Sequence, residues 1–171
     1  ILSHVLPVHC CRELLNRSIL PPVNGSPVNT LFVSQIIYSP LHGAGHKLVP
    51  EIPRRTGLKH LYLVDEQCVI DGNFPTVEKP NPEYAAVLGI GVELANKVGS
   101  NLIIATDPDA DRVGVVARDK NGSFRTITGN QMGALLLDYI ITAYEETNTM
   151  PPKPYAVKTI VSTELVSKIC E

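Results

Sequence analysis

The stretch Asn101-Leu-Ile-Ile-Ala-Thr-Asp-Pro-Asp-Ala-Asp-Arg-Val-Gly-Val-Val116 places a group of carboxylates between two apolar runs. Residues 102–105 are apolar and mostly branched, which is typical of a strand buried on both faces. Three aspartates follow at alternate positions, namely Asp107, Asp109 and Asp111. The apolar run predicts a central strand of an α/β fold, and the carboxylates lie where that strand ends.

The spacing of the aspartates predicts a loop rather than a continued strand. Along a strand the alternate carboxylates would lie about 6.6 Å apart, because each residue rises about 3.3 Å. One Mg²⁺, whose oxygen ligands lie about 2.1 Å away, could not contact all three. A helix would place alternate residues about 200° apart around its axis. Pro108 favours a curl, since it lacks an N–H and fixes φ. We expect a tight loop around a divalent cation at the carboxyl end of a strand, where open α/β sheets bind ligands.

Two other kinds of acidic loop can be tested against the spacing of these aspartates. An EF-hand loop that began at Asp107 would need Gly and Glu where the chain has Arg112 and Arg118, so an EF-hand is excluded. An aspartyl-phosphate phosphatase would need a downstream Lys and a pair of aspartates, and no aspartate pair follows. A solvated acidic turn remains an alternative.

Apolar runs and helical periodicities alternate along the chain, which predicts a three-layer α/β/α domain. Strands are expected at residues 31–38, 61–64, 102–105, 113–118, 124–127 and 156–161. Helices are expected at residues 8–16, 47–56 and 82–98, and from Asn130 and Thr163 onward. The pair Asn121-Gly122 predicts a hairpin between two of the strands. The sheet is therefore expected to be mostly parallel but mixed.

Local signals predict the ends and the buried faces of two helices. Asn81 is expected to cap a helix whose first residue is Pro82, and Gly99 is expected to close it. Pro53 is expected to kink or shorten the helix at 47–56. In the helix from Asn130, the residues at helical spacing are expected to belong to the core: Met132, Leu135, Leu136, Tyr139, Ile140 and Ala143.

Composition limits the classes of function. The chain has 171 residues, 44% of them apolar, and a net charge of −2, which argues against nucleic acid as a partner. No apolar run approaches about 18 residues, so no membrane span is expected. The four cysteines form no CxxC pair, which favours reduced thiols in a cytoplasmic protein. The first residue is Ile, and we expect the chain to begin inside a longer gene product.

Three further segments accompany the carboxylate stretch. They are Tyr38-Ser-Pro-Leu-His-Gly-Ala-Gly45, Asp71-Gly-Asn-Phe-Pro-Thr-Val77 with Pro80-Asn-Pro-Glu83, and Gly129-Asn-Gln-Met-Gly-Ala-Leu-Leu136. Together with Thr106-Asp-Pro-Asp-Ala-Asp-Arg112 they resemble, in order, the motifs of the α-D-phosphohexomutases, the phosphoglucomutase and phosphomannomutase family. The resemblance implies that residues 1–127 are the second domain of that family. Residues 128–171 would then be the N-terminal part of a similar third domain.

The resemblance also implies a reaction, a metal and a set of contacts. The family moves a phosphoryl group between the 1- and 6-positions of a hexose phosphate through a phosphoserine and a bisphosphate, with hexose 1,6-bisphosphate as activator. Mg²⁺, or Mn²⁺ in its place, would be bound by Asp107, Asp109 and Asp111. Contacts to phosphate or to the phosphoserine loop are expected from Arg112, His42, Gly43 and Lys158. The phosphoserine itself is expected upstream, so this fragment should hold no catalytic residue.

Several alternatives remain open. Arg112 could form a salt bridge to a neighbouring aspartate of the loop, and His42 could form a structural hydrogen bond in a turn. The chain as a whole could be a fragment of a phosphohexomutase that needs the missing domains of its parent. It could instead be a stand-alone metal-dependent phosphatase or glycosyltransferase, or a non-catalytic module that binds metal or sugar phosphate.

Overall fold

A computed structural model of the chain describes residues 35–55 and 58–171. The helix expected at 8–16 and the first half of the strand expected at 31–38 lie outside these residues. Within them, five strands form one sheet in the order β2-β1-β3-β4-β5. The strands are β1 (Ile36–Ser39), β2 (Leu61–Leu63), β3 (Leu102–Thr106), β4 (Val113–Arg118) and β5 (Phe124–Ile127).

The sheet is mixed, as the sequence predicts. β1 pairs in parallel with both β2 and β3, whereas β4 pairs antiparallel with β3 and with β5. Only β4 therefore runs against the other strands. The register places Ile37, Ile103 and Val116 side by side across the three central strands. All three side chains are buried, and they form the centre of the core.

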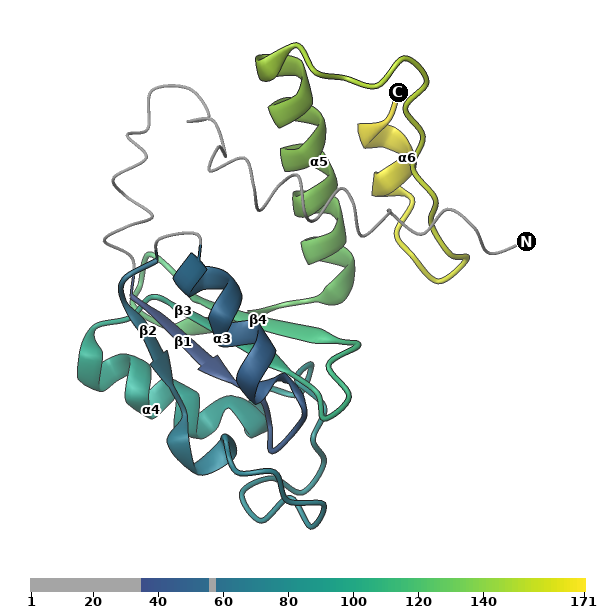
Figure 1. Cartoon of the computed structure of the whole chain (residues 1–171). Coiled ribbons are helices and arrows are strands. Elements are labelled where there is room, and N and C mark those ends of the chain that lie inside the picture. The colour runs from purple at the N-terminus through teal and green to yellow at the C-terminus, as the bar shows by residue number, and fades with distance from the viewer. Residues whose placement is uncertain (1–34, 56–57) are drawn as a thin grey trace.

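Two helices cover opposite faces of the sheet, which confirms the three layers (Figure 1). α4 (Gly89–Val98) packs on the face of Ile37 and Ile103, where a β-carbon at Gly91 would lie 3.2 Å from the Ile103 side chain. α3 (Gly45–Arg55) begins on the other face, where a β-carbon at Gly45 would lie 2.5 Å from the Tyr38 hydroxyl. α3 continues past Pro53 to Arg55, so the shortening expected from this proline does not occur.

The helix predicted from Pro82 begins later than the sequence indicates. A short 3₁₀ helix, η2 (Ala85–Leu88), precedes α4, whose first residue is Gly89. Asn81 instead closes a turn, because its side chain accepts a hydrogen bond from the Glu83 N–H at 3.0 Å. Pro82 is fully buried against Gly114 of β4, where a β-carbon would lie 2.1 Å from the Pro82 carbonyl oxygen. The predicted N-terminus is wrong because this packing holds the segment in a turn.

The C-terminus of α4 follows the prediction. Gly99 adopts a left-handed conformation with φ 76°, and the cap N–H donates to the Ala95 carbonyl. A residue without a β-carbon adopts this conformation at no steric cost. A second 3₁₀ helix, η1 (Asp65–Gln67), follows β2. None of the helices in residues 35–55 and 58–171 is long and apolar enough to span a bilayer.

α5 (Gly129–Thr147) leaves the sheet after β5, and α6 (Leu165–Ile169) packs against it (Figure 1). Thr128 caps α5 in a reciprocal pair with Gln131: each side chain accepts a hydrogen bond from the other residue's backbone N–H. The Thr-x-x-Gln spacing of this capping box is visible in the sequence. Asn130 also accepts a hydrogen bond from the Thr163 N–H at 2.9 Å, which ties the end of the chain to α5.

The apolar stripe of α5 is not a core in this structure, contrary to the prediction. Of the six residues expected in the core, Leu135, Leu136 and Ile140 are exposed, and Met132, Tyr139 and Ala143 are only half-buried. Ala134 is the buried residue of the helix. The strand expected at 156–161 is also not formed, and Val157 is 85% exposed. The two errors have one physical cause. A strand needs a neighbouring strand for its backbone hydrogen bonds, and within the described residues no strand pairs with 156–161. The described residues likewise cover the α5 stripe only in part.

The turn between β4 and β5 provides a prediction on pH dependence. The Asp119 carboxylate accepts hydrogen bonds from Arg125 Nε at 2.7 Å and from the N–H groups of Asn121 and Ser123. These bonds, with that of Arg125 the largest, lower the pKa of Asp119 below its ordinary 3.8. The ionised carboxylate therefore stabilises the fold above pH 3.8, and this contribution is lost as the pH falls through the lower folded-state pKa.

We expect Asp119→Asn to lower the melting temperature at neutral pH, with a difference from the wild type that shrinks in acid. Thermal melts of both proteins across the acid range measure this difference. A difference that stays constant with pH would contradict the role assigned to the charge.

Candidate metal-binding site

The carboxylate loop, residues 107–112, begins where β3 ends at Thr106. It turns sharply: the Ala110 N–H donates to the Asp107 carbonyl at 3.0 Å, and Ala110 takes a φ of 60°. A residue with a β-carbon adopts this left-handed conformation at a cost, so the surrounding structure must hold it. One carboxylate oxygen from each of the three aspartates lies within 4.8 Å of the others. The predicted curl of the loop is therefore confirmed.

The three aspartates differ in environment. Asp107 is 2% exposed, whereas Asp109 and Asp111 are exposed on the loop. The Asp107 carboxylate accepts a hydrogen bond from the Arg112 N–H at 2.9 Å and pairs with Arg112 Nε at 3.1 Å. Arg112 Nε also lies 3.6 Å from Asp111. Arg112 therefore forms the salt bridge to loop aspartates that was one of its two expected roles. Its contact to phosphate stays a prediction.

The charge of the loop favours a cation. The pKa of Asp111 is raised, chiefly because its carboxyl can share a proton with Asp107 and also because Asp109 is close; Arg112 opposes this shift. Three carboxylates and one divalent cation would leave a net charge of −1, so a cation would relieve this repulsion. Carboxylate oxygens are the ligands that Mg²⁺ and Mn²⁺ prefer. The residues present therefore fit such an ion.

A second segment, the supporting turn of residues 40–44, lies against the carboxylate loop. The Ala44 N–H donates to the Pro108 carbonyl at 2.8 Å. A β-carbon at Gly43 would lie 2.3 Å from Pro108 Cα, so only a glycine allows the two backbones to approach this closely. The structure thus gives Gly43 a packing role, and its predicted contact to phosphate stays untested.

His42 is buried and bonded at both ring nitrogens. Nδ1 lies 2.9 Å from the Val69 carbonyl, and Nε2 lies 2.8 Å from the Thr76 hydroxyl. A carbonyl can only accept, so Nδ1 carries the proton, and in the neutral ring Nε2 accepts from Thr76. These are the contacts of the structural alternative. The phosphate or phosphoserine contact of His42 stays a prediction.

Lys158 lies in the segment after α5, outside the carboxylate loop and the supporting turn. Its Nζ pairs with Glu164 at 2.8 Å, and this hydrogen bond lowers the pKa of Glu164. Within the part of the chain that the structure describes, no contact joins Lys158 to the carboxylate loop. Its reach to a substrate phosphate therefore stays a prediction.

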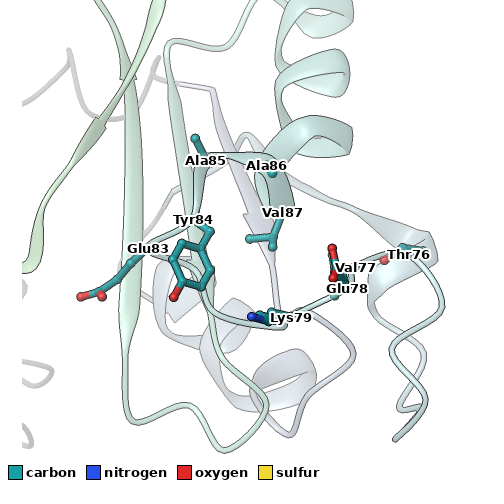
Figure 2. A pocket seen from close by; sticks show the side chains of 9 residues that line it. All are labelled: Thr76, Val77, Glu78, Lys79, Glu83, Tyr84, Ala85, Ala86 and Val87. Carbon is teal, nitrogen blue, oxygen red and sulfur yellow. The ribbon is translucent and has the colours of Figure 1, made fainter.

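A cavity of about 670 Å³ lies apart from the three aspartates, in the segment that precedes α4 (Figure 2). Its lining residues are Thr76, Val77, Glu78, Lys79, Glu83, Tyr84, Ala85, Ala86 and Val87. Figure 2 shows the side chains of Tyr84, Lys79 and Val87 around one opening. No pattern in the sequence predicts this hollow, because the segment has only the composition of a polar loop before a helix.

The fold and the loop define a class of protein: an α/β/α domain with converging carboxylates at the carboxyl end of a central strand. The family described as "Phosphoglucomutase/phosphomannomutase, alpha/beta/alpha domain II" matches residues 28–122, more than half of the chain. The chain belongs to this phosphoglucomutase/phosphomannomutase family, as its motifs predict.

Named relatives agree with this assignment. A phosphomannomutase of Mycoplasmoides pirum is 43% identical over 134 residues, which are 78% of this chain and 24% of the relative. A phosphoglucomutase of Staphylococcus aureus (strain N315) is 40% identical over 135 residues, 79% of this chain and 24% of the relative. The chain therefore spans about a quarter of the length of these relatives.

A solved structure shares the fold. The phosphoglucomutase/phosphomannomutase family protein of Burkholderia thailandensis aligns with a TM-score of 0.53 at 23% identity. The alignment covers 64% of this chain and 22% of that one.

Proposed function

We propose that this chain supplies the metal-binding part of a Mg²⁺-dependent phosphohexomutase. The observation that carries the proposal is the convergence of Asp107, Asp109 and Asp111 at the carboxyl end of β3. Membership of the phosphoglucomutase/phosphomannomutase family supports it. In this proposal residues 1–127 act as the second domain of the parent enzyme, and residues 128–171 begin its third.

The three aspartates would hold Mg²⁺, or Mn²⁺ in its place. When bound, such an ion neutralises charge on phosphate oxygens and acts as a Lewis acid. Asp107 is fixed by its two bonds to Arg112, whereas Asp109 and Asp111 face solvent. The same pairing restrains the Arg112 guanidinium, whose planar group suits phosphate oxygens.

The reaction proposed for the parent is exchange of a phosphoryl group between the 1- and 6-positions of a hexose phosphate. A phosphoserine donates the group, a bisphosphate forms, and hexose 1,6-bisphosphate serves as activator. The phosphoserine and the sugar-binding groups belong, in this proposal, to the other domains of the parent. The partners are then a hexose phosphate and those domains, in the cytoplasm.

We expect the 171-residue chain alone to show no mutase turnover. The phosphoserine that donates the group is expected upstream of this chain, and positioning of reactants, which the other domains would complete, can supply roughly 7–11 kcal/mol of a barrier. The assay follows interconversion of glucose 1-phosphate and glucose 6-phosphate with Mg²⁺ and glucose 1,6-bisphosphate. Release of inorganic phosphate is measured in the same samples.

Two results would overturn this proposal. Interconversion that disappears in Asp107→Asn would mean that the active centre is complete in this chain. Metal-dependent release of phosphate that disappears in the same variant would favour the stand-alone phosphatase. A matched Asp138→Asn variant, changed on the exposed side of α5, controls for loss of charge.

A further inference from the structure

We propose that Ser39, Gln67 and Thr76 are positioning residues for the carboxylate loop, acting through His42 and the supporting turn. The inference rests on the proposed function, since it assigns these residues to the alignment of the metal ligands. It concerns residues that lie outside the carboxylate loop and that do not contact the ion themselves.

The side chains form one directed chain of hydrogen bonds. Nδ1 of His42 donates to the Val69 carbonyl, so in the neutral ring Nε2 accepts from the Thr76 hydroxyl. The Thr76 oxygen accepts from Gln67 Nε2 at 3.0 Å, and Gln67 Oε1 accepts from the Ser39 hydroxyl at 2.6 Å. Each bond in this chain therefore pairs one donor with one acceptor.

The chain of hydrogen bonds returns to the supporting turn at both ends. The Ser39 oxygen accepts from the Leu41 N–H at 3.1 Å, and the Gln67 carbonyl accepts from the His42 N–H at 2.8 Å. Gln67, on η1, therefore contacts the supporting turn through its backbone and bonds Ser39, at the end of β1, through its side chain. The four side chains form a closed network around the turn, which we call the His42 network: Ser39, His42, Gln67 and Thr76.

Burial makes this network sensitive to the loss of one member. Ser39, His42 and Gln67 are all at most 3% exposed, whereas Thr76 is half-buried, with its hydroxyl bonded to the buried side chains of His42 and Gln67. Water cannot readily replace a missing partner at such a depth, so removal of one hydroxyl leaves a buried donor or acceptor unpaired. The network is therefore expected to form as a unit.

The supporting turn needs such a restraint because its backbone is unfavourable. Leu41 has a φ of 45° and His42 a φ of 65°, both in the left-handed region that side chains with a β-carbon disfavour. Gly43 and Ala44 follow directly and touch Pro108 of the carboxylate loop. The carboxylate loop is strained as well, at Ala110. Strain of this kind persists only where surrounding contacts hold it, and it gathers at functional sites.

The consequence is a path from Thr76 to the metal ligands. Thr76 holds the His42 ring, the ring holds the supporting turn, and the turn holds Pro108 between Asp107 and Asp109. Without the Thr76 hydroxyl, the turn is expected to relax toward ordinary φ values and to withdraw from Pro108. The three carboxylates would then lose part of their alignment.

The test compares Thr76→Val with two other variants of the whole chain. Valine keeps the shape of threonine and removes its hydroxyl, whereas Thr76→Ser keeps the hydroxyl. Thr126→Val makes the same change in β5, at the far edge of the sheet from β2. Mn²⁺ binding is measured by electron paramagnetic resonance, and the amide resonances of Ala44, Ala110 and Arg112 are recorded without metal.

We expect Thr76→Val to shift these amides and to weaken Mn²⁺ binding about tenfold, the equivalent of one or two lost hydrogen bonds. The Mn²⁺ affinities of Thr76→Ser and Thr126→Val should stay within about twofold of that of the wild type, which is well below a tenfold change. A merely structural role would lower the melting temperature of Thr76→Val but leave the Mn²⁺ affinity of the folded protein unchanged.

The two proposals fail in different ways. Unmoved amides in Thr76→Val, or an unchanged Mn²⁺ affinity beside a wild type that binds, overturn the positioning role. A wild type that binds no Mn²⁺ overturns the proposed metal function. In that case the amide shifts of Thr76→Val still decide whether the network positions the loop.

Discussion

Gly43→Ala is expected to destabilise the chain by about 1–3 kcal/mol, the usual range for an overpacked interior, and to weaken metal binding. The added β-carbon would lie 2.3 Å from Pro108 Cα and 2.5 Å from its carbonyl oxygen. These are backbone atoms, so they cannot give way without moving the carboxylate loop. The hydrogen bond from the Ala44 N–H to Pro108 would be lost with that movement.

Urea unfolding followed by circular dichroism measures the loss of stability. Gly133→Ala is the matched control, because nothing lies within 4 Å of a β-carbon added there and the residue is inside α5. Alanine favours a helix interior by about 1 kcal/mol over glycine, so this control should gain stability. A Gly43→Ala variant as stable as the wild type would show that the two segments are not packed as described.

Asp109→Asn is expected to weaken Mn²⁺ binding by about 100-fold, since changes next to metal ligands alone cost about 10–100-fold. The stability of the metal-free chain should be kept, because Asp109 is exposed and shares the loop with like charges. Asp107→Asn should lose both binding and stability, because the buried Asp107 carboxylate pairs with Arg112.

Calorimetric titrations and thermal melts of the two variants separate these effects. Asp138→Asn in α5 removes the same charge at a distance from the loop and should bind like the wild type. If Asp109→Asn binds the ion as tightly as the wild type, the loop is not the metal site.

The central strand, the curl of the loop and the β4–β5 hairpin could be predicted because each depends on local signals. The apolar run at 102–105 needs burial on both faces, and Asn121-Gly122 suits a tight turn. The curl followed from the spacing of the aspartates together with Pro108. The candidate metal ligands Asp107, Asp109 and Asp111 could be found from the sequence because they lie within five consecutive residues.

Helix starts were less predictable because one signal fits two structures. Asn81 with Pro82 suits a helix N-cap, yet the same pair also closes a turn through the Asn81 side chain. The turn forms rather than the helix because Pro82 packs against Gly114, which lies more than thirty residues further along the chain. Nothing local to Asn81 reports that contact.

The apolar stripe of α5 and the strand expected at 156–161 show a related limit. Their patterns correctly describe surfaces that suit burial, but a pattern does not state which segment covers them. Leu135 is 56% and Val157 85% exposed, so the described part of the chain leaves these surfaces largely uncovered.

The roles of His42 also depended on distant partners. Val69 and Thr76, which bind its two ring nitrogens, are 27 and 34 residues away in sequence. The Tyr-x-Pro-Leu-His-Gly motif marked the residue without revealing these contacts. The supporting turn is thus a feature that only the structure could supply.

The most direct test of the metal site is a Mn²⁺ titration of the 171-residue chain, with the free ion followed by electron paramagnetic resonance. We predict one saturable site per chain, displaced by Mg²⁺ and removed when Asp107, Asp109 and Asp111 are all changed to Asn. Binding that does not saturate, or that persists unchanged in the triple variant, would contradict the account.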